Sequence, residues 1–275
     1  MTNKIEPYKD IAGIYEEIRP SYPEELIMDI TVKTNLRTDD ILLEIGAGTG
    51  KATIQFAKRG YMIKAVEIGE DMARILKAKC ADYSNVTVDI ASFEEWRNPD
   101  NKKYDMIYSA QAFHWIDKSI KYRKCYELLK EEGYLVLFWY NASNQKSDKT
   151  KELLKMIDMT VSKYIKDYYK DDCKPKRTEH DGVSKEDERI NEIESSGLFE
   201  VVEKSTYTYK IDNNAAQHLK AMKSVPAIAS KLDGIDDKII EKMDFEIEEI
   251  INKHGGKITT IFAYNLYIAK KVSNR

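Results

Sequence analysis

Hydrophobic and polar positions along the first half of the chain follow an alternation typical of an α/β protein. Five mostly apolar runs predict strands: "DILLEIG", "YMIKAVEI", "NVTVDI", "YDMIYSA" and "YLVLFWY". Between them, residues 51–59, 71–81 and 119–130 carry apolar side chains at helical spacing. Strands that alternate with helices predict a parallel, doubly wound sheet, whose central strands are apolar because helices cover both faces.

A further helix is predicted before the first strand, within the stretch "SYPEELIMDITVKTNL". Pro23 suits the first turn of a helix, and Glu24 and Glu25 favour its positively polarised amino end. The apolar residues that follow them lie on one stripe at helical spacing. We therefore expect a helix to lead into the sheet.

The pattern changes after Tyr140. Residues 141–194 are rich in Lys, Asp, Glu and Tyr, and "ELLKMIDMTVSKYIKDYY" within them predicts a helix. The polar run "KDDCKPKRTEHDGVSKEDE" predicts a mobile loop inserted over the sheet. A solvated surface excursion without a functional role is the alternative interpretation of this run.

Two strand-like stretches close the chain, "FEVVEKSTYTYKI" and "GKITTIFAYNLYIAKK", and we expect them to add an antiparallel pair at the edge of the sheet. The residues between them look helical and are expected to wall a substrate pocket. The length of 275 residues favours a single domain, residues 1–275, with an elaboration. Three parts are expected. Residues 15–140 form a cofactor-binding core, residues 141–198 a helical and charged insertion acting as a lid, and residues 199–275 the final strands with pocket helices.

Composition narrows the classes of protein and partner. The net charge of −3 and the pI near 6.0, with both signs of charge mixed along the chain, disfavour a nucleic-acid partner. Cys80, Cys125 and Cys173 are odd in number and widely separated, so neither a disulfide framework nor a zinc site is predicted, and no metal is expected. The chain shows no apolar run long enough to cross a membrane and no signal peptide, which together favour a cytoplasmic protein.

The stretch "LLEIGAGTGKAT" contains a glycine loop between a predicted strand and a predicted helix. A P-loop would need a glycine at position 45 and a hydroxyl residue after the lysine, but the chain has Ile45 and Ala52. A dinucleotide fingerprint would need a small residue at position 51, where the chain has Lys51. Both phosphate-binding interpretations are therefore disfavoured.

Two acidic residues suggest a different ligand. Glu44 stands two residues before Gly46, where its carboxylate would repel a phosphate and attract a cation. Glu67 closes the next predicted strand, about 20 residues further on, where an acidic residue reaches the ribose hydroxyls in nucleoside-binding α/β folds. The alternative interpretations are an ordinary strand–turn–helix at the glycines and a simple helix cap at Glu67.

The pattern Glu44-x-Gly46-x-Gly48-x-Gly50 resembles the first motif of the class I S-adenosylmethionine-dependent methyltransferases. Three more stretches, "YEEIRPSYP", "ASFEEW" and "SAQAFHWID", are similar to the small-molecule branch often called type 11, which includes the ubiquinone/menaquinone and trans-aconitate methyltransferases. The resemblance covers residues 15–140 well and the rest loosely. It implies a Rossmann-like, seven-stranded sheet, mostly parallel with an antiparallel edge.

The resemblance also implies a chemistry. S-adenosylmethionine would donate a methyl group by in-line displacement to an unidentified small molecule, leaving S-adenosylhomocysteine, and no metal is required. A non-catalytic S-adenosylmethionine- or nucleoside-binding protein of the same fold is the alternative. A nicotinamide-dependent oxidoreductase is a third and weaker hypothesis, because Lys51 breaks the dinucleotide fingerprint.

The residues that match the family's motifs receive expected roles from the resemblance. Glu44 would receive the amino end of the cofactor, directly or through water, and Glu67 would accept both ribose hydroxyls. The remaining cofactor contacts are expected from the backbone of the loop, from the adenine pocket and from the end of the fourth strand: Gly46, Ala47, Gly48 and Gly50; Ile68, Met72, Ser92 and Phe93; Ala110 and Gln111. Many relatives carry an Asp where this chain has Ser92, which weakens the expectation for that residue.

Two clusters complete the expected site. His114, followed by Trp115, is a candidate general base, and the alternative is that both residues pack the wall of the substrate pocket. Tyr15 and Arg19 are expected near the cofactor and Tyr22 in the substrate pocket, where the guanidinium would bind a carboxylate of the cofactor or the substrate. Simple aromatic packing of this amino-terminal segment is the competing interpretation.

Overall fold

The computed structural model describes residues 12–98, 101–143, 147–165 and 185–272. The chain divides into two compact units. The first comprises residues 1–140, 182–207 and 264–275, and the second comprises residues 141–181 and 208–263. Each unit is considered by itself below.

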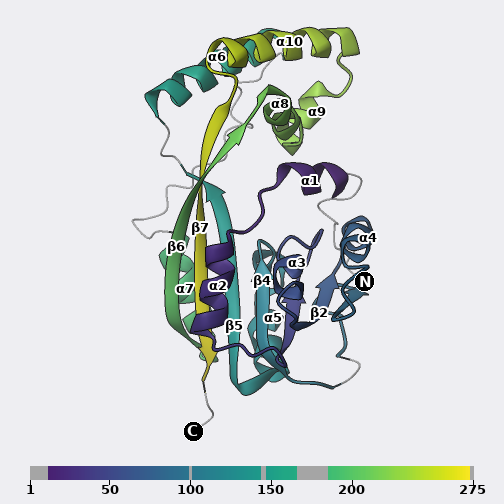
Figure 1. Ribbon diagram of the computed structural model, residues 1–275, viewed down its shortest axis with the longest axis vertical. Coiled ribbons are helices and arrows are strands. Elements are labelled where there is room, and N and C mark those ends of the chain that lie inside the picture. Colours follow the sequence, from purple (N-terminus) through teal and green to yellow (C-terminus); the bar gives the residue numbers. More distant parts are fainter. Residues whose placement is uncertain (1–11, 99–100, 144–146, 166–184, 273–275) are drawn as a thin grey trace. The chain divides into compact units, whose positions relative to one another are not determined.

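The first unit contains the greater part of a seven-stranded sheet with the order β3-β2-β1-β4-β5-β7-β6 (Figure 1). β1 pairs in parallel with β2 and β4, β2 with β3, and β4 with β5, whereas the last strand, β7, runs in the opposite direction. The bounds of the strands are β1 (Ile41–Ile45), β2 (Met62–Glu67), β3 (Val86–Ile90), β4 (Tyr104–Ala110), β5 (Leu129–Ala142), β6 (Phe199–Asn213) and β7 (Ile258–Lys271). The predicted doubly wound, mostly parallel sheet with an antiparallel edge is confirmed.

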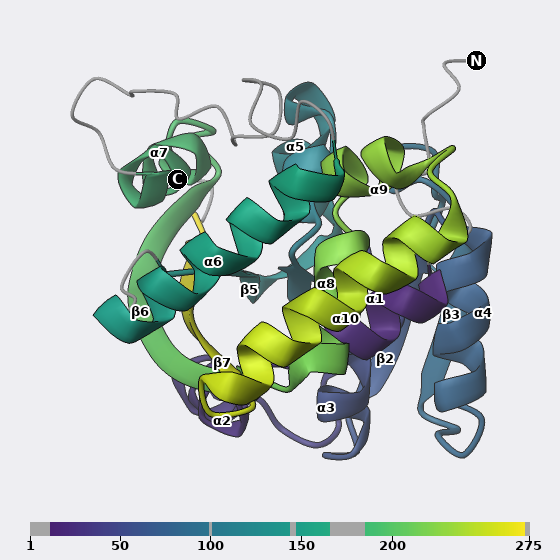
Figure 2. The ribbon, with the colours of Figure 1, turned by 90° about the horizontal axis from the view of Figure 1, so that it is seen from above.

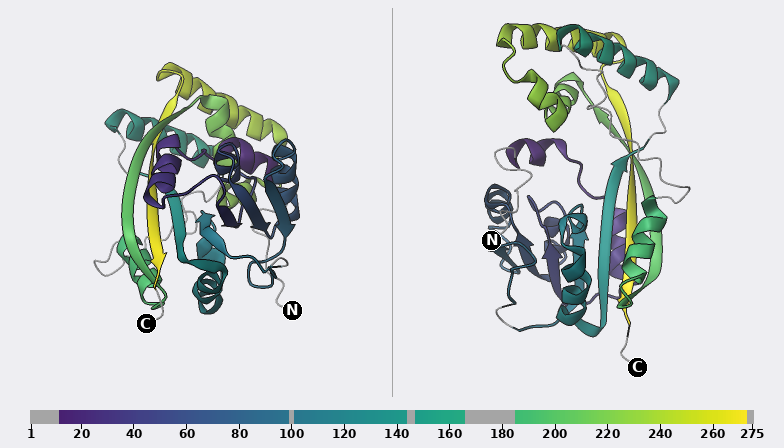
Figure 3. Two further views of the ribbon diagram at one scale, coloured as in Figure 1. Left: turned by 60° about the horizontal axis from the view of Figure 1, so that its bottom comes forward. Right: turned by 180° about the vertical axis from the view of Figure 1, so that it is seen from behind.

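The three carboxyl-side strands are long. Figure 3 shows β5, β7 and β6 side by side. Each of them belongs partly to the first unit and partly to the second: the chain enters the second unit after residue 140 in β5 and after residue 207 in β6, and returns to the first after residue 263 in β7. β5 starts at Leu129, before the predicted run "YLVLFWY". The polar residues ahead of that run hid its first part from the sequence pattern.

Helices of the first unit follow the predicted alternation, with two additions. They are α1 (Ala12–Ile18), α2 (Glu24–Lys33), α3 (Thr53–Ala57), α4 (Glu70–Lys79), α5 (Lys118–Leu128) and α7 (Lys185–Glu194), with a 3₁₀ turn, η1 (Phe113–Trp115). α3 is shorter than predicted because its first residues belong to the turn after Gly50. α1 and α7 were not predicted as helices.

α7 overlaps the end of the polar run for which a mobile loop was predicted; the run's earlier residues, 170–184, lie outside the described residues. The charged sequence of α7 contains two apolar residues, Ile190 and Ile193, three positions apart. Ile193 is buried in the core of the first unit and Ile190 packs against it. Two apolar residues are too weak a pattern to distinguish a helix with one buried face from a solvated loop, unless the surface that they pack against is known.

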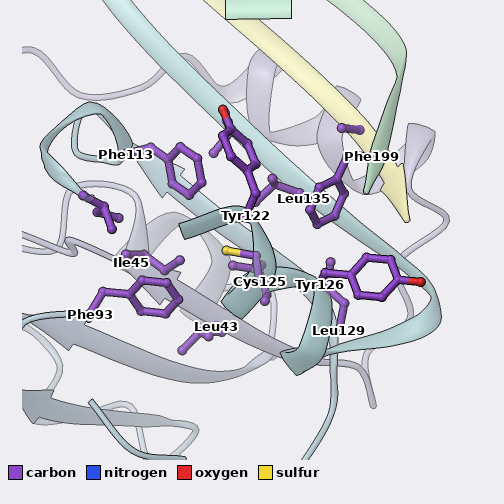
Figure 4. Packing of buried hydrophobic residues seen from close by; sticks show 14 of the residues in the cluster. Leu43, Ile45, Phe93, Phe113, Tyr122, Cys125, Tyr126, Leu129, Leu135 and Phe199 are labelled. Carbon is purple, nitrogen blue, oxygen red and sulfur yellow. The ribbon is translucent and has the colours of Figure 1, made fainter. Parts of the chain in front are cut away.

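One hydrophobic core of the first unit lies between the sheet and the helices on one of its faces (Figure 4). Strand residues such as Leu43 and Leu135 meet Tyr122 and Cys125 of α5 there, and Phe199 of β6 joins them. These side chains are almost fully removed from water, which is the main stabilising contribution to such a sheet.

The second unit is mainly helical. Its helices are α6 (Asp148–Tyr164), α8 (Ala215–Lys223), α9 (Pro226–Leu232) and α10 (Asp237–Lys253). α6 and α10 lie side by side (Figure 2), and apolar residues at helical spacing, including Leu153, Ile157, Ile247 and Ile251, bury one face of each. This unit therefore combines α6 from the predicted insertion, residues 141–198, with helices from the predicted carboxyl-terminal part.

Within the described ranges, no helix is long and apolar enough to cross a membrane. The same residues contain no group of three or more His, Cys, Asp or Glu side chains arranged to hold a metal ion.

Candidate cofactor-binding site

The glycine loop connects the end of β1 to α3 through three residues in the left-handed region. Gly46, Gly48 and Gly50 have φ angles of +69°, +57° and +83°, which side chains other than glycine rarely adopt. A Cβ atom on Gly46 would lie 2.3 Å from Cβ of Ala112, and one on Gly50 would lie 2.5 Å from Cδ1 of Leu76. A Cβ atom on Gly48 would meet nothing within 4 Å. The first and third glycines therefore allow close packing, whereas Gly48 exposes its backbone to open space.

Backbone hydrogen bonds fix the loop to the adjacent strand. The amides of Gly46 and Ala47 donate to the carbonyl oxygen of Val66 in β2, at 2.8 and 3.3 Å. The amide of Gly50 donates to the carbonyl of Ala47 at 3.0 Å and closes the turn. The loop is thus held in shape by the protein itself.

Glu44 is buried in β1 beneath this loop. Its Oε2 accepts hydrogen bonds from Thr53 Oγ1 at 2.5 Å and Tyr108 Oη at 2.9 Å. Burial raises the pKa of Glu44 to about 8, although both hydroxyls and the charge of Lys79 lower it, and the nearby Glu67 raises it further. A cation placed beside Glu44 would therefore favour its ionised form.

Glu67 lies at the carboxyl end of β2 on the same side of the sheet. Its Oε2 accepts from the amide of Gly48 at 2.7 Å, and its Oε1 accepts from the amide of Gly69 at 2.8 Å. The carboxylate joins the glycine loop to the start of α4, near the half-buried Ile68 and the buried Met72. An ionised carboxylate accepts hydrogen bonds at about four positions, and these two amides occupy two of them.

The end of β4 carries a strained turn. Gln111 adopts a φ of +62°, which is uncommon for a residue other than glycine and typically occurs at functional sites. Its amide donates to the carbonyl of Phe138 at 3.1 Å, and its side-chain amide donates to the carbonyl of Tyr140 at 2.8 Å. This turn begins after the half-buried Ala110 and brings Ala112 against the glycine loop.

Ser92 and Phe93 follow β3. Ser92 Oγ accepts from the amide of Glu95 at 3.3 Å, so the hydroxyl participates in a turn. The ring of Phe93 is buried in the core, with Lys124 Nζ 4.8 Å from its centroid. A ligand at Phe93 would therefore meet the backbone and not the ring.

His114 lies in η1 and contacts β5. Its Nδ1 accepts a hydrogen bond from Trp139 Nε1 at 3.2 Å, although the side chain of His114, like that of Trp115, is exposed. Because the indole N–H is only a donor, Nδ1 must carry the lone pair, and the proton of a neutral imidazole is on Nε2.

Burial lowers the pKa of His114, and the positive charges of Arg189 and Lys121 lower it further, against a smaller opposite effect of Glu192. Arg189, from α7, has its guanidinium carbon 4.0 Å from the centroid of the Trp139 ring. Both effects favour the neutral imidazole. Neither Trp139, within an apolar strand pattern, nor Arg189, within a polar run, could be identified from the sequence as its neighbours.

The amino-terminal cluster is divided by the structure. Arg19 follows α1 and has its guanidinium carbon 5.4 Å from the centroid of the Tyr15 ring. Tyr22 is buried and packs edge-on against Phe138, with ring centroids 4.8 Å apart. Burial raises the pKa of Tyr22 well above its ordinary value, which fits a core side chain.

The fold and this site define an α/β protein in which a glycine loop and two acidic residues lie at the carboxyl ends of β1 and β2. Residues 42–133 match the family model described as a methyltransferase domain. The matched residues, which include the glycine loop, Glu44 and Glu67, are thus similar to a methyltransferase domain.

Individual relatives are consistent with this similarity. The chain is 32% identical over 145 residues to an uncharacterized methyltransferase of Mycobacterium tuberculosis, over 53% of this chain and 56% of the relative. It thus spans a little over half the length of this curated relative. The solved structure of the YcgJ protein of Bacillus subtilis covers 92% of this chain and 100% of its own, with 16% identity and a TM-score of 0.54.

A second solved structure contains a ligand. Phosphoethanolamine N-methyltransferase 2 of Haemonchus contortus, in complex with phosphomonomethylethanolamine and S-adenosylhomocysteine, has 12% identity and a TM-score of 0.51. The alignment covers 95% of this chain and 57% of that one. At such low identities, both likenesses concern the fold alone.

Proposed function

We propose that the protein binds S-adenosylmethionine at the glycine loop and transfers its methyl group to a small-molecule acceptor. The observation that carries the proposal is the space beside Gly48, where a Cβ atom would meet nothing within 4 Å, together with the carboxyl groups of Glu67, which accepts from the Gly48 amide, and of Glu44 in β1. When bound, this cofactor supplies a methyl carbon that an adjacent sulfonium makes electrophilic.

The residues present fit such a ligand better than they fit a phosphate. Two carboxyl groups near the loop favour an ammonium group and ribose hydroxyls, and would repel a pyrophosphate. Lys51, the cation nearest to the loop in sequence, directs its Nζ to the main-chain oxygen of Glu16 at 2.6 Å. It is therefore not held ready for a phosphate.

Each expected cofactor contact becomes part of the proposal with a defined role. Glu44 binds the amino end, Glu67 binds the ribose hydroxyls, and Tyr15 and Arg19 bound the site from the amino-terminal segment. The adenine is held by Ile68, Met72, Ser92 and the backbone of Phe93, and the methionine portion by Gly46, Ala47, Gly48, Ala110 and Gln111. Gly50 maintains the turn, because a side chain there would collide with α4.

The protein's contribution to the reaction is orientation. Holding an acceptor in line with the methyl carbon converts a bimolecular step into an effectively unimolecular one, with an effective molarity on the order of 10⁵ M or more. The tautomer of His114 supports a donor and packing role in preference to a general base, because Nδ1 is engaged by Trp139 and Nε2 carries the proton. We therefore propose an acceptor that is already nucleophilic when it binds, with His114 and Trp115 beside it.

Calorimetry with S-adenosylhomocysteine tests cofactor binding. We expect binding by the wild-type protein and an affinity at least about 10-fold weaker for Glu67→Ala, because each carboxylate hydrogen bond to a ligand contributes about 1.5–3 kcal/mol. Circular dichroism should show that this variant remains folded. Binding of NAD without binding of S-adenosylhomocysteine would overturn the proposal.

Catalysis requires a separate experiment. Incubation with S-adenosylmethionine and pooled small metabolites should release S-adenosylhomocysteine above the rate seen without acceptor, whereas an RNA pool should not. Binding of the cofactor without turnover on any pool would favour the alternative, a non-catalytic binding protein of the same fold.

A further inference from the structure

Lys51 has a structural partner that its position in the loop did not suggest. It directly follows Gly50, and its side chain is only 12% exposed. Its Nζ donates to the main-chain oxygen of Glu16 at 2.6 Å and lies 3.5 Å from Oε2 of the same residue. The residue that breaks the dinucleotide fingerprint therefore connects the glycine loop to α1.

A second lysine binds the same carboxylate from another element. Lys79, the last residue of α4, places its Nζ 2.8 Å from Glu16 Oε1. Burial raises the pKa of Glu16, but the hydrogen bonds from Lys79 and Thr49 and the charges of Lys51 and Lys79 together outweigh it, and the pKa is below its ordinary value. Glu16 is thus an ionised, partly buried carboxylate held between two ammonium groups.

α1 depends on such contacts for its position. It contains only seven residues, and a helix of that length is not stable by itself in water. It packs against α4 and carries Tyr15, while Arg19, whose amide donates to the carbonyl of Tyr15 at 3.0 Å, follows directly. Whatever holds Glu16 therefore also places Tyr15 and Arg19.

We propose that Glu16, Lys51 and Lys79 are positioning residues that dock α1 on the glycine loop and on α4, so that the amino-terminal segment encloses the cofactor. This inference rests on the proposed function only for the identity of the cofactor. The docking itself is a property of the unliganded protein. None of the three side chains needs to touch the ligand.

Hydrogen–deuterium exchange of the unliganded protein tests the docking. Lys51→Met and Glu16→Gln each remove one charge at nearly constant size, and we expect the amides of residues 13–19 to exchange at least about 5-fold faster in both variants. Lys77→Met, an exposed neighbour on α4, is the matched control and should leave these amides unchanged. Unchanged exchange in both test variants would overturn the proposal.

S-adenosylhomocysteine affinity provides the second readout. We expect about 5- to 30-fold weaker binding for Lys51→Met and Glu16→Gln. The double variant should lose less than the two single losses combined, because the two changes share the ion pair between Lys51 and Glu16. Additive losses, or losses equal to that of Lys77→Met, would contradict the shared docking role. If the wild-type protein bound no S-adenosylhomocysteine, the proposed function would fail, whereas the exchange experiment would still decide whether the three residues dock α1.

Discussion

Glu44 shows how one residue combines a predictable chemistry with an unpredictable environment. Its acidity and its place before the glycines follow from the sequence, and they suggested a cationic ligand. Its hydrogen-bond partners, Thr53 and Tyr108, come from α3 and β4, and no local pattern connects them with position 44. Both partners are neutral hydroxyls, which explains why burial dominates the pKa of this carboxyl group.

The raised pKa of Glu44 predicts a pH-dependent stability. Between its ordinary value of 4.5 and about 8, the folded protein retains a proton that the unfolded chain has lost, so the free energy of unfolding falls as the pH rises through this interval. Two charged groups act on Glu44: the carboxylate of Glu67 raises its pKa and increases this pH dependence, whereas the ammonium of Lys79 lowers the pKa and decreases it.

Between pH 5 and pH 8, we expect the free energy of unfolding of the wild-type protein to fall by about 3 kcal/mol more than that of the Glu44→Gln variant. Urea unfolding of both proteins at the two pH values measures this difference. The two proteins share all their other titrating groups. If their free energies of unfolding changed in parallel with pH, Glu44 would already be ionised in the folded protein.

Among the secondary-structure elements, those with a wide apolar stripe or a continuous apolar run were found from the sequence, and those that depend on a partner surface were not. α2, α4 and α10 match their predicted positions closely, and β4 has the predicted bounds. α1 was missed because it has only seven residues, and α7 because its sequence is mostly charged. Their helical state depends on where they dock: Glu16 between two lysines for α1, and Ile193 in the core for α7.

α10 offers a test of the packing in the second unit. Ile247 is fully buried in the cluster that α6, α8 and α10 share, whereas Phe245, two residues earlier, is 64% exposed. We expect Ile247→Ala to lower the free energy of unfolding by about 2–5 kcal/mol and Phe245→Ala to change it by no more than about 0.5 kcal/mol. Chemical denaturation followed by circular dichroism compares the two variants, and similar losses would contradict this assignment of the buried face.

At the scale of the whole molecule, the sheet depends on its last strand, β7. β7 lies between β5 and β6, so it supplies hydrogen-bond partners to both, and its residues Leu266, Tyr267 and Ile268 are fully buried. Tyr267 also packs against Trp139 of β5, with ring centroids 5.8 Å apart. Removal of β7 would leave β6 without its neighbour and expose the apolar surface that β7 covers.

A truncated chain tests this dependence. A chain that ends at Gly256 is expected to lose cooperative thermal unfolding, because two strands lose their backbone partners and a large apolar area becomes exposed. A chain that ends at Val272, after the last residue of β7, is the control and should unfold cooperatively. Cooperative unfolding of the shorter chain would show that β7 is dispensable for the sheet.

The sequence by itself determined the class of fold, because strand and helix patterns alternate and the period of apolar residues is a local property. It also determined the glycine loop and the two acidic positions, since left-handed turns require glycine and carboxylates have few substitutes. These features depend on neighbours within a few residues, which the sequence displays directly.

Only the tertiary structure decided which groups surround those residues. It placed Thr53 and Tyr108 on Glu44, Trp139 on His114, and Glu16 on Lys51, across separations along the chain that no periodicity bridges. These contacts set the pKa of Glu44, the tautomer of His114 and the position of α1, because each depends on desolvation and on charges that folding brings together.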